Sequence, residues 1–294
     1  MLGLSDKSWL VEMLHPQDAA AAQSAGDAPP PREYDAYFGL GYSVRLLDRP
    51  PVFKVSLAGL ALGAYLVRAL DDTMLEGSFL DLGTGSGVHA LLLRRLGATH
   101  VTGTDLSCEA VMLARENELL NFGDQRITFQ ESDLFLGLNA PSGQYDTVIF
   151  NPPGWRTPSQ RLLARLASNA DGTDMPVSAM FYGDDVLLKF LEQLPRHLKP
   201  GGRAIVGLNS LVGIQDVLGR YRLGHAGKPP LRYRLLERHA LPLLYYSASW
   251  RAQQGALEAE FRDWRDHALA AYSTDGRGSI YWSYEIVEFQ FSER

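Results

Sequence analysis

The pattern of apolar and polar positions predicts alternating strands and helices in the middle of the chain. Short apolar runs typical of buried strands alternate with longer segments whose apolar residues recur every three or four positions, as on one face of a helix. The predicted strands span residues 78–83, 100–105, 126–132 and 145–150, and the helices between them span 88–97 and 108–120. Such alternation forms crossover units, so we expect a Rossmann-like α/β fold, with a mostly parallel sheet and helices on both faces.

The chain before this region has a different pattern. A short amphipathic segment at residues 5–14 is followed by an alanine- and proline-rich stretch at residues 19–33, which is typical of a flexible connector. Residues 34–53 then show the alternation of short strands joined by turns. We therefore expect an N-terminal lid and small strand-containing extension over residues 1–53, and a catalytic domain over residues 54–294.

The chain after residue 183 continues the alternation. A helix is predicted at residues 184–197 and a strand at 203–208, where the sequence reads RAIVGL. Beyond it, apolar periodicity predicts a strand in LRYRLLERH at residues 231–239, a helix at 256–272 and a final strand at 281–291. The catalytic domain is therefore expected to extend well beyond the first four strands.

Composition and charge indicate which binding partners and which cell compartment to expect. The formal net charge of −6 over 294 residues provides no overall basic field for a phosphate backbone, so nucleic acid is an unlikely partner. Cys108 is the only cysteine, which excludes an intramolecular disulfide and is typical of a reducing compartment. None of the seven histidines stands at a metal-ligand spacing, so no metal is expected. Without an apolar run of about 20 residues, we expect a cytoplasmic protein with no membrane contact.

A glycine-rich loop stands where the first predicted strand gives way to the first helix. It reads DLGTGSG from Asp81 to Gly87, and its glycines allow the backbone to approach a ligand closely. A dinucleotide-binding fingerprint would place its third glycine one residue later, where Val88 stands. Acids also end or follow three successive strands, and Asp81, Asp105 and Asp133 could bind an ammonium group, two ribose hydroxyls and an adenine amino group respectively.

This combination of loop and acids resembles the class I S-adenosylmethionine-dependent methyltransferases, over roughly residues 53–208. The resemblance implies that S-adenosylmethionine is the cofactor. It also implies a cofactor site on the loop and at the ends of the following strands. The residues of that site are Asp81, Gly83, Thr84, Gly85, Gly87, Asp105, Leu106, Asp133, Leu134 and Asn151.

The sequence NPPGW, Asn151 to Trp155, follows the fourth predicted strand. It resembles the N-P-P-[aromatic] motif of the adenine-N6 and protein-glutamine-N5 methyltransferases. The resemblance implies that the Asn151 side-chain oxygen and the Pro152 carbonyl hold the nucleophilic nitrogen, and Tyr182 is a third catalytic candidate. This sequence departs from the motif at Gly154, where an aromatic normally stacks on the target group. Trp155, at the next position, could substitute for that aromatic.

These residues predict methyl transfer to a nitrogen atom by in-line displacement. A small molecule is the expected acceptor, because the motif is altered and the chain is acidic. A competing hypothesis is cyclisation of S-adenosylmethionine itself to azetidine-2-carboxylate and methylthioadenosine, in which the cofactor is the substrate. The same residues are also compatible with a protein-glutamine or nucleobase N-methyltransferase, or with a catalytically silent cofactor-binding subunit. The sequence does not indicate the oligomeric state.

Overall fold

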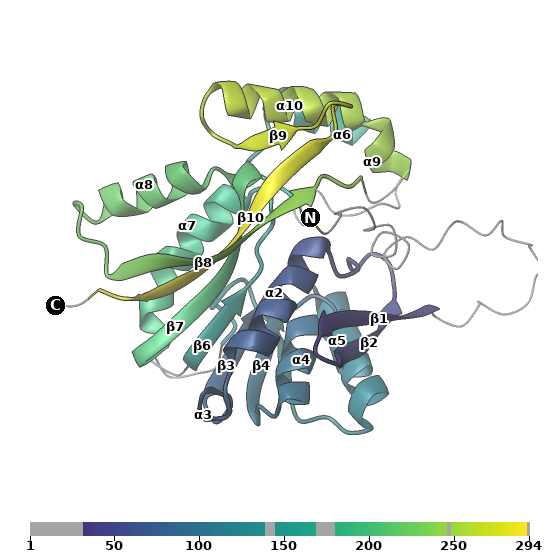
Figure 1. The fold of residues 1–294 in the computed structure, drawn as a ribbon, viewed down its shortest axis with the longest axis vertical. Coiled ribbons are helices and arrows are strands. Elements are labelled where there is room, and N and C mark those ends of the chain that lie inside the picture. Colours follow the sequence, from purple (N-terminus) through teal and green to yellow (C-terminus); the bar gives the residue numbers. More distant parts are fainter. Residues whose placement is uncertain (1–31, 139–144, 169–179, 246–247, 293–294) are drawn as a thin grey trace, which may run out of the picture.

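A computed structural model describes residues 32–138, 145–168, 180–245 and 248–292. The predicted N-terminal lid lies mostly outside these residues. Within them, a two-stranded hairpin precedes a sheet in the spatial order β5-β4-β3-β6-β7-β10-β8, with β9 paired to β10 (Figure 1). The strands are β1 (Arg32–Gly39), β2 (Tyr42–Asp48), β3 (Ser78–Leu82), β4 (His100–Asp105), β5 (Thr128–Glu131), β6 (Tyr145–Phe150), β7 (Leu198–Asn209), β8 (Leu231–Pro242), β9 (Tyr272–Thr274) and β10 (Ile280–Phe291).

Five neighbouring strands of the main sheet, from β5 to β7, run parallel to one another. The last strand, β10, is inserted between β7 and β8 and is antiparallel to both. The predicted Rossmann-like fold with a mostly parallel sheet is confirmed. The carboxyl ends of β3, β4, β5 and β6 therefore meet at one edge of the sheet, where open parallel sheets bind ligands.

Helices cover both faces of the sheet (Figure 1). The helices are α2 (Leu57–Ala69), α3 (Asp72–Leu75), α4 (Val88–Leu96), α5 (Cys108–Phe122), α6 (Gln160–Ser168), α7 (Gly183–Gln193), α8 (Ile214–Gly224), α9 (Ala248–Ala252) and α10 (Gln254–Asp266). Side chains of α2, α4 and α5 share one apolar core with Phe79 of β3, whereas α7 and α8 share a second core with Leu80. Successive residues of β3 thus bury opposite faces, as the period of a strand requires.

The β1–β2 hairpin is attached to the sheet through α5. Asn117 of α5 has no exposed surface, and its Oδ1 accepts a hydrogen bond from the Leu47 N–H of β2 at 2.9 Å. Its Nδ2 donates to the carbonyl of Ser86 in the glycine loop, also at 2.9 Å. One buried amide therefore connects the hairpin to the loop that the sequence identified as a ligand site.

Within the described part of the chain, no helix combines the length and the apolarity that crossing a membrane requires.

Replacing Asn117 by Ala should lower the free energy of unfolding by about 2 to 4 kcal/mol, because a partly buried N–H and a buried C=O both lose their partner. Urea denaturation followed by circular dichroism measures the loss. The control is Gln125→Ala, which removes an amide that donates to the Arg115 carbonyl at the exposed surface. A similar loss in both variants would show that the Asn117 bridge contributes nothing specific.

Candidate functional site

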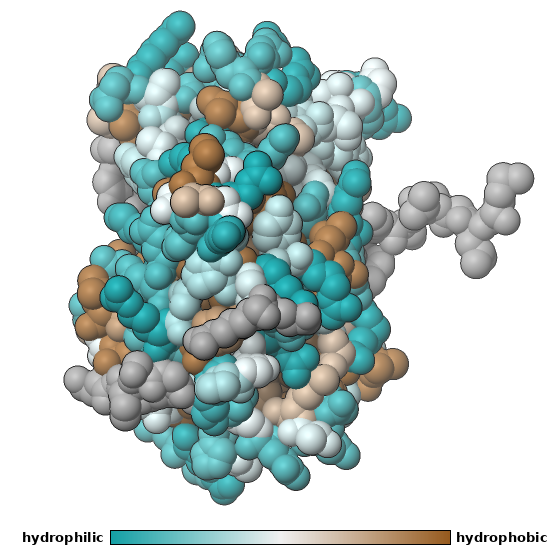
Figure 2. Space-filling model, turned by 90° about the vertical axis from the view of Figure 1, so that its left-hand side faces the viewer, coloured by the Kyte–Doolittle hydropathy of each residue, from teal (hydrophilic) through white to brown (hydrophobic). Residues whose placement is uncertain are grey.

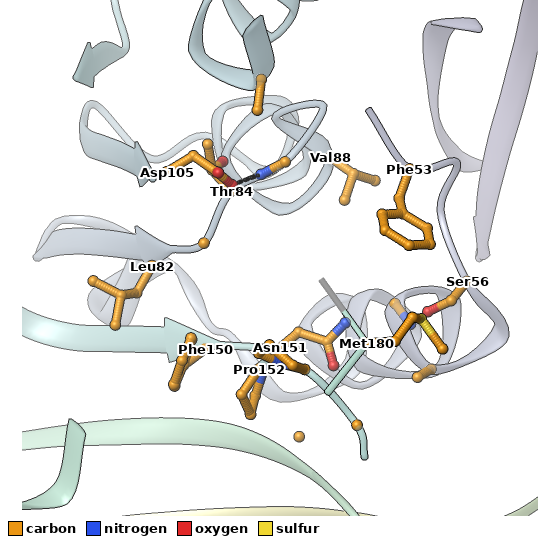
Figure 3. A pocket seen from close by; sticks show the side chains of 18 of the residues that line it. Phe53, Ser56, Leu82, Thr84, Val88, Asp105, Phe150, Asn151, Pro152 and Met180 are labelled. Atoms are coloured by element: carbon orange, nitrogen blue, oxygen red, sulfur yellow. Dashed lines mark hydrogen bonds between the residues drawn. The ribbon is translucent and has the colours of Figure 1, made fainter. Parts of the chain in front are cut away.

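A cavity of about 720 Å³ opens at the carboxyl edge of the parallel strands. Its wall includes the glycine loop after β3, the end of β4 and the residues that follow β6, and the segment before α2 closes it from another side (Figure 3). Phe53 and Ser56 of that segment lie across the cavity from Leu82. The volume is in the range of sites for drug-sized ligands and cofactors.

The glycine loop folds tightly because three of its glycines adopt left-handed backbone conformations, with φ of 64° at Gly83, 55° at Gly85 and 85° at Gly87. The Thr84 N–H donates to the Thr104 carbonyl of β4 at 2.7 Å, which ties the loop to the neighbouring strand. Thr84, within the loop, is buried and belongs to the cavity wall. The loop thus presents backbone to the cavity at the start of α4.

Asp81, predicted to contact a cofactor ammonium directly or through water, lies beneath the loop and is only 1% exposed. Its Oδ2 accepts hydrogen bonds from the Thr84 hydroxyl at 2.5 Å and from the Ala90 N–H at 3.1 Å. His89 Nδ1 lies 3.9 Å from the other oxygen, and burial raises the pKa of the carboxyl. The side chain is not part of the cavity wall. In this arrangement Asp81 braces the loop from below, and its contact with a cofactor ammonium stays a prediction.

Asp105 does line the cavity. Its Oδ2 accepts a hydrogen bond from the Gly85 N–H at 2.8 Å (Figure 3). Its Oδ1 accepts one from the Ser107 N–H at 3.0 Å. Burial raises the pKa of this carboxyl, whereas the two backbone donors oppose the rise. Each carboxylate oxygen has further acceptor capacity, so Asp105 can accept hydroxyl donors from a ligand while it holds the loop.

The remaining cofactor candidates lie at the edge of the same cavity. Leu106 is 66% exposed, Asp133 is exposed and Leu134 is half-buried, and all three belong to the cavity wall. These residues follow β4 and β5, as the sequence predicted. They form an apolar and acidic margin that suits a flat ring with a polar edge.

Asn151 follows β6, and its amide is directed towards the side of the cavity where Ser56 and Met180 lie (Figure 3). Its Oδ1 accepts a hydrogen bond from the Tyr284 hydroxyl of β10 at 2.9 Å. Tyr284 is 1% exposed, and it was not identified from the sequence. The signal that could have found it is Gly207, a glycine inside a strand, which indicates that another group approaches closely.

Asn209 occupies the space into which a side chain at Gly154 would extend. A Cβ at Gly154 would lie 2.5 Å from Asn209 Nδ2. The Oδ1 of Asn209 accepts a hydrogen bond from the Leu211 N–H at 2.9 Å, so its NH₂ group is the end that faces Gly154. Asn209 lines the cavity. The Asn209 amide therefore occupies the space next to Gly154 at the cavity wall.

Trp155, the next residue, contributes its ring to an aromatic cluster. It is 3% exposed and lies in an aromatic cluster with Phe181, Trp250 and Phe261, at centroid distances of 5.0, 5.5 and 5.1 Å. These rings belong to the apolar core beneath α9 and α10. The indole therefore packs in the core, while Trp155 also belongs to the cavity wall, so its stacking on the target group stays a prediction.

Tyr182 is brought to the motif by the backbone. It caps α7 in a left-handed conformation, with φ of 67°, and it lines the cavity. The next residue, Gly183, donates its N–H to the Trp155 carbonyl at 2.8 Å, and a Cβ there would lie 2.1 Å from the Pro153 carbonyl oxygen. Pro152 lines the same cavity. The three predicted catalytic residues therefore share one wall of the site.

Comparison with known proteins identifies the class of this domain. A family model described as "Methyltransferase domain" matches residues 76–215. A putative protein N5-glutamine methyltransferase from Methanocaldococcus jannaschii is 29% identical over 61% of this chain and 83% of its own length. A release factor glutamine methyltransferase from Rhodopirellula baltica is 32% identical over 50% of this chain, and the match spans only 49% of that relative.

Among solved structures, a T. thermophilus 16S rRNA N2 methyltransferase in complex with AdoMet and guanosine has a TM-score of 0.50 at 22% identity. The match covers 73% of this chain and 50% of that one. This likeness shows a shared fold.

The prediction that nucleic acid is an unlikely partner and a small molecule the expected one is wrong. The relatives are named as methyltransferases of protein glutamine and of ribosomal protein L11, and a protein of the same fold is an rRNA methyltransferase. The prediction rested on net charge, which is summed over the chain and does not describe a local surface. Arg232, Arg234 and Arg238 are all exposed along β8, for example, and Figure 2 shows a largely hydrophilic face.

Replacing Trp155 by Ala should lower the free energy of unfolding by about 3 to 5 kcal/mol, the cost of removing a large aromatic from a packed core. Urea denaturation measures this loss. Tyr37→Ala is the control, because this aromatic of β1 is 47% exposed and its removal should cost about 0.5 kcal/mol or less. Unchanged stability in Trp155→Ala would contradict a structural role for the indole.

The sheet order, the cofactor loop and the family match all concern the same part of the chain. The predicted enzyme class and the predicted cofactor are confirmed by these findings. Residues 76–215 of this chain match a methyltransferase domain, in agreement with an S-adenosylmethionine-dependent methyltransferase.

Proposed function

We propose that the protein transfers a methyl group from S-adenosylmethionine to a carboxamide nitrogen of a protein, with a glutamine side chain as the acceptor. The observation that carries this proposal is the amide oxygen of Asn151, held by Tyr284 at the wall of the cavity beside the cofactor loop. Relatives named as glutamine methyltransferases support the same acceptor.

The glycine loop and the acids fit the cofactor. S-adenosylmethionine carries no phosphate, and its ribose offers two hydroxyl donors. Asp105 would accept those hydroxyls, since its carboxylate faces the cavity while it also holds Gly85. Leu106, Asp133 and Leu134 would surround the adenine. Asp81 would act through the loop that it braces, because its Oδ2 accepts hydrogen bonds from the Thr84 hydroxyl and the Ala90 N–H.

The acceptor would be held by complementary amides. The Asn151 oxygen retains one lone pair beyond the hydrogen bond from Tyr284, and with the Pro152 carbonyl it can accept the two N–H groups of a carboxamide. The NH₂ group of Asn209 can donate to the carboxamide oxygen, because the other end of that side chain is bonded to Leu211. A glutamine amide offers both N–H donors and a C=O acceptor, so it satisfies this set of groups.

Catalysis in this proposal is chiefly positioning. When bound, S-adenosylmethionine supplies a methyl group on a positively charged sulfur, which leaves as a neutral thioether. Asn151 and Pro152 hold the nitrogen so that its lone pair is aligned with that methyl group, and such alignment can supply several kcal/mol of the rate acceleration. The methylated nitrogen then loses its extra proton to water.

The cofactor assignment is tested at Asp105. The substitution Asp105→Ala should weaken S-adenosylmethionine binding by about 10- to 150-fold, which corresponds to about 1.5 to 3 kcal/mol for hydrogen bonds to a charged group. Titration calorimetry measures the dissociation constant. Asp133→Ala is the companion variant, with an expected weakening of about tenfold or less because this carboxylate is exposed. An unchanged dissociation constant in Asp105→Ala would remove the ribose contact from the proposal.

The acceptor assignment is tested with labelled S-adenosylmethionine and a ribosomal protein fraction that lacks methylated glutamine. We expect the label in N5-methylglutamine after digestion, and S-adenosylhomocysteine as the by-product. Asn151→Ala should lower this turnover by about a hundredfold or more while cofactor affinity stays within a few fold. Label in RNA from the same fraction would reassign the acceptor to a nucleobase. Methylthioadenosine formed without any acceptor, and lost in Asn151→Ala, would show that the cyclisation hypothesis is correct.

A further inference from the structure

We infer that Tyr284 is a positioning residue that sets the orientation of the Asn151 amide in the active site. The inference rests on the proposed role of Asn151 and deepens it, because it adds a residue from the last strand to a site built on the parallel strands. The Tyr284 hydroxyl donates to Asn151 Oδ1 at 2.9 Å, across 133 positions of sequence.

Tyr284 can contact Asn151 only because a residue of β7 between them, Gly207, has no side chain. In the sheet, β7 separates β10 from β6, and Tyr284 pairs with Asn209 of β7. A Cβ at Gly207 would lie 1.8 Å from the Tyr284 hydroxyl oxygen and 2.5 Å from Cζ. The tyrosine ring therefore passes over Gly207, and only a glycine at this position lets the hydroxyl cross β7 to reach Asn151.

The surroundings of Tyr284 fix both the ring and the direction of the hydrogen bond. Trp282 meets the ring edge-on, with centroids 6.0 Å apart and an interplanar angle of 89°. Burial raises the pKa of the tyrosine, so the hydroxyl keeps its proton, and it donates this proton to Asn151 Oδ1. The oxygen of the amide therefore points to Tyr284, and its position is defined relative to the Pro152 carbonyl.

A defined amide oxygen matters for the reaction because a rotated Asn151 would present its NH₂ group to the N–H groups of the acceptor. Two donors facing each other repel, whereas the oxygen accepts. The hydrogen bond from Tyr284 disfavours the rotated form, since that form would leave the buried hydroxyl without an acceptor. Tyr284 thus raises the fraction of molecules in which Asn151 is ready to bind the nitrogen.

The first test is Tyr284→Phe, which removes only the hydroxyl. We expect the S-adenosylmethionine dissociation constant to stay within about twofold and the turnover on the ribosomal protein fraction to fall by about tenfold or more. Tyr221→Phe is the matched control, because Tyr221 is also buried, at 2% exposure, but lies in the core on the α7 and α8 side of the sheet. Its turnover should equal that of the wild type.

A purely structural hydrogen bond is separated from a positioning one by a double-variant cycle. If Tyr284 acts through Asn151, the double variant Asn151→Ala with Tyr284→Phe should be no slower than Asn151→Ala alone. A crystal structure of Tyr284→Phe with S-adenosylmethionine should show the Asn151 amide rotated or in two conformations. Losses that multiply in the double variant would overturn the inference.

Gly207→Ala provides an independent route to the same state, since the added methyl group displaces the tyrosine hydroxyl. Gly219→Ala is its control, because a Cβ at that position in α8 meets nothing within 4 Å. We expect Gly207→Ala to lose turnover at least as strongly as Tyr284→Phe, and Gly219→Ala to lose none.

The outcomes separate this inference from the proposed function. A large loss in Asn151→Ala together with wild-type turnover in Tyr284→Phe would overturn the role of Tyr284 and leave the function of Asn151 standing. Wild-type turnover in Asn151→Ala would overturn the proposed function, and the role of Tyr284 in it would fall as well.

Discussion

The buried carboxylate of Asp81 is the constraint on which the cofactor loop depends. A carboxylate removed from water is costly unless its oxygens accept hydrogen bonds. Here the donors are the Thr84 hydroxyl in the loop and the Ala90 N–H in the first turn of α4. Because one donor comes from the loop and the other from the helix, their hydrogen bonds to this carboxylate hold the loop against the start of α4. The glycine backbone is left to face the cavity, and Asp105 holds it there through Gly85.

Features encoded by short stretches of sequence could be predicted. The glycine loop, the acids at strand ends and the Asn-Pro-Pro motif each follow a strand whose apolar run is easy to recognise. Because parallel strands point their carboxyl ends to one edge, knowing the strands is enough to bring Gly85, Asp105 and Asn151 to the same cavity. The two cores on either side of the sheet follow from the same periodicity.

Features that depend on distant pairing could not be predicted. Tyr284 looks like one more aromatic in an alternating strand, and its role depends on the insertion of β10 beside β7 in one particular register. Asn209 acquires its place through contact with Gly154, which a local pattern does not reveal. The inward turn of Asp81 and the core packing of Trp155 likewise depend on which neighbours the fold supplies. The net charge of the whole chain also does not show that the arginines of β8 lie on its exposed surface.

The late position of β10 has a consequence for the growing chain. All residues of the cofactor loop and its acids precede residue 134, whereas the hydroxyl that orients Asn151 arrives with residue 284. The strand that carries it also joins β7 to β8, so the sheet is continuous only after β10 has been made. In the proposed mechanism, a nascent chain therefore contains the residues of its cofactor loop well before it contains the strand that orients Asn151.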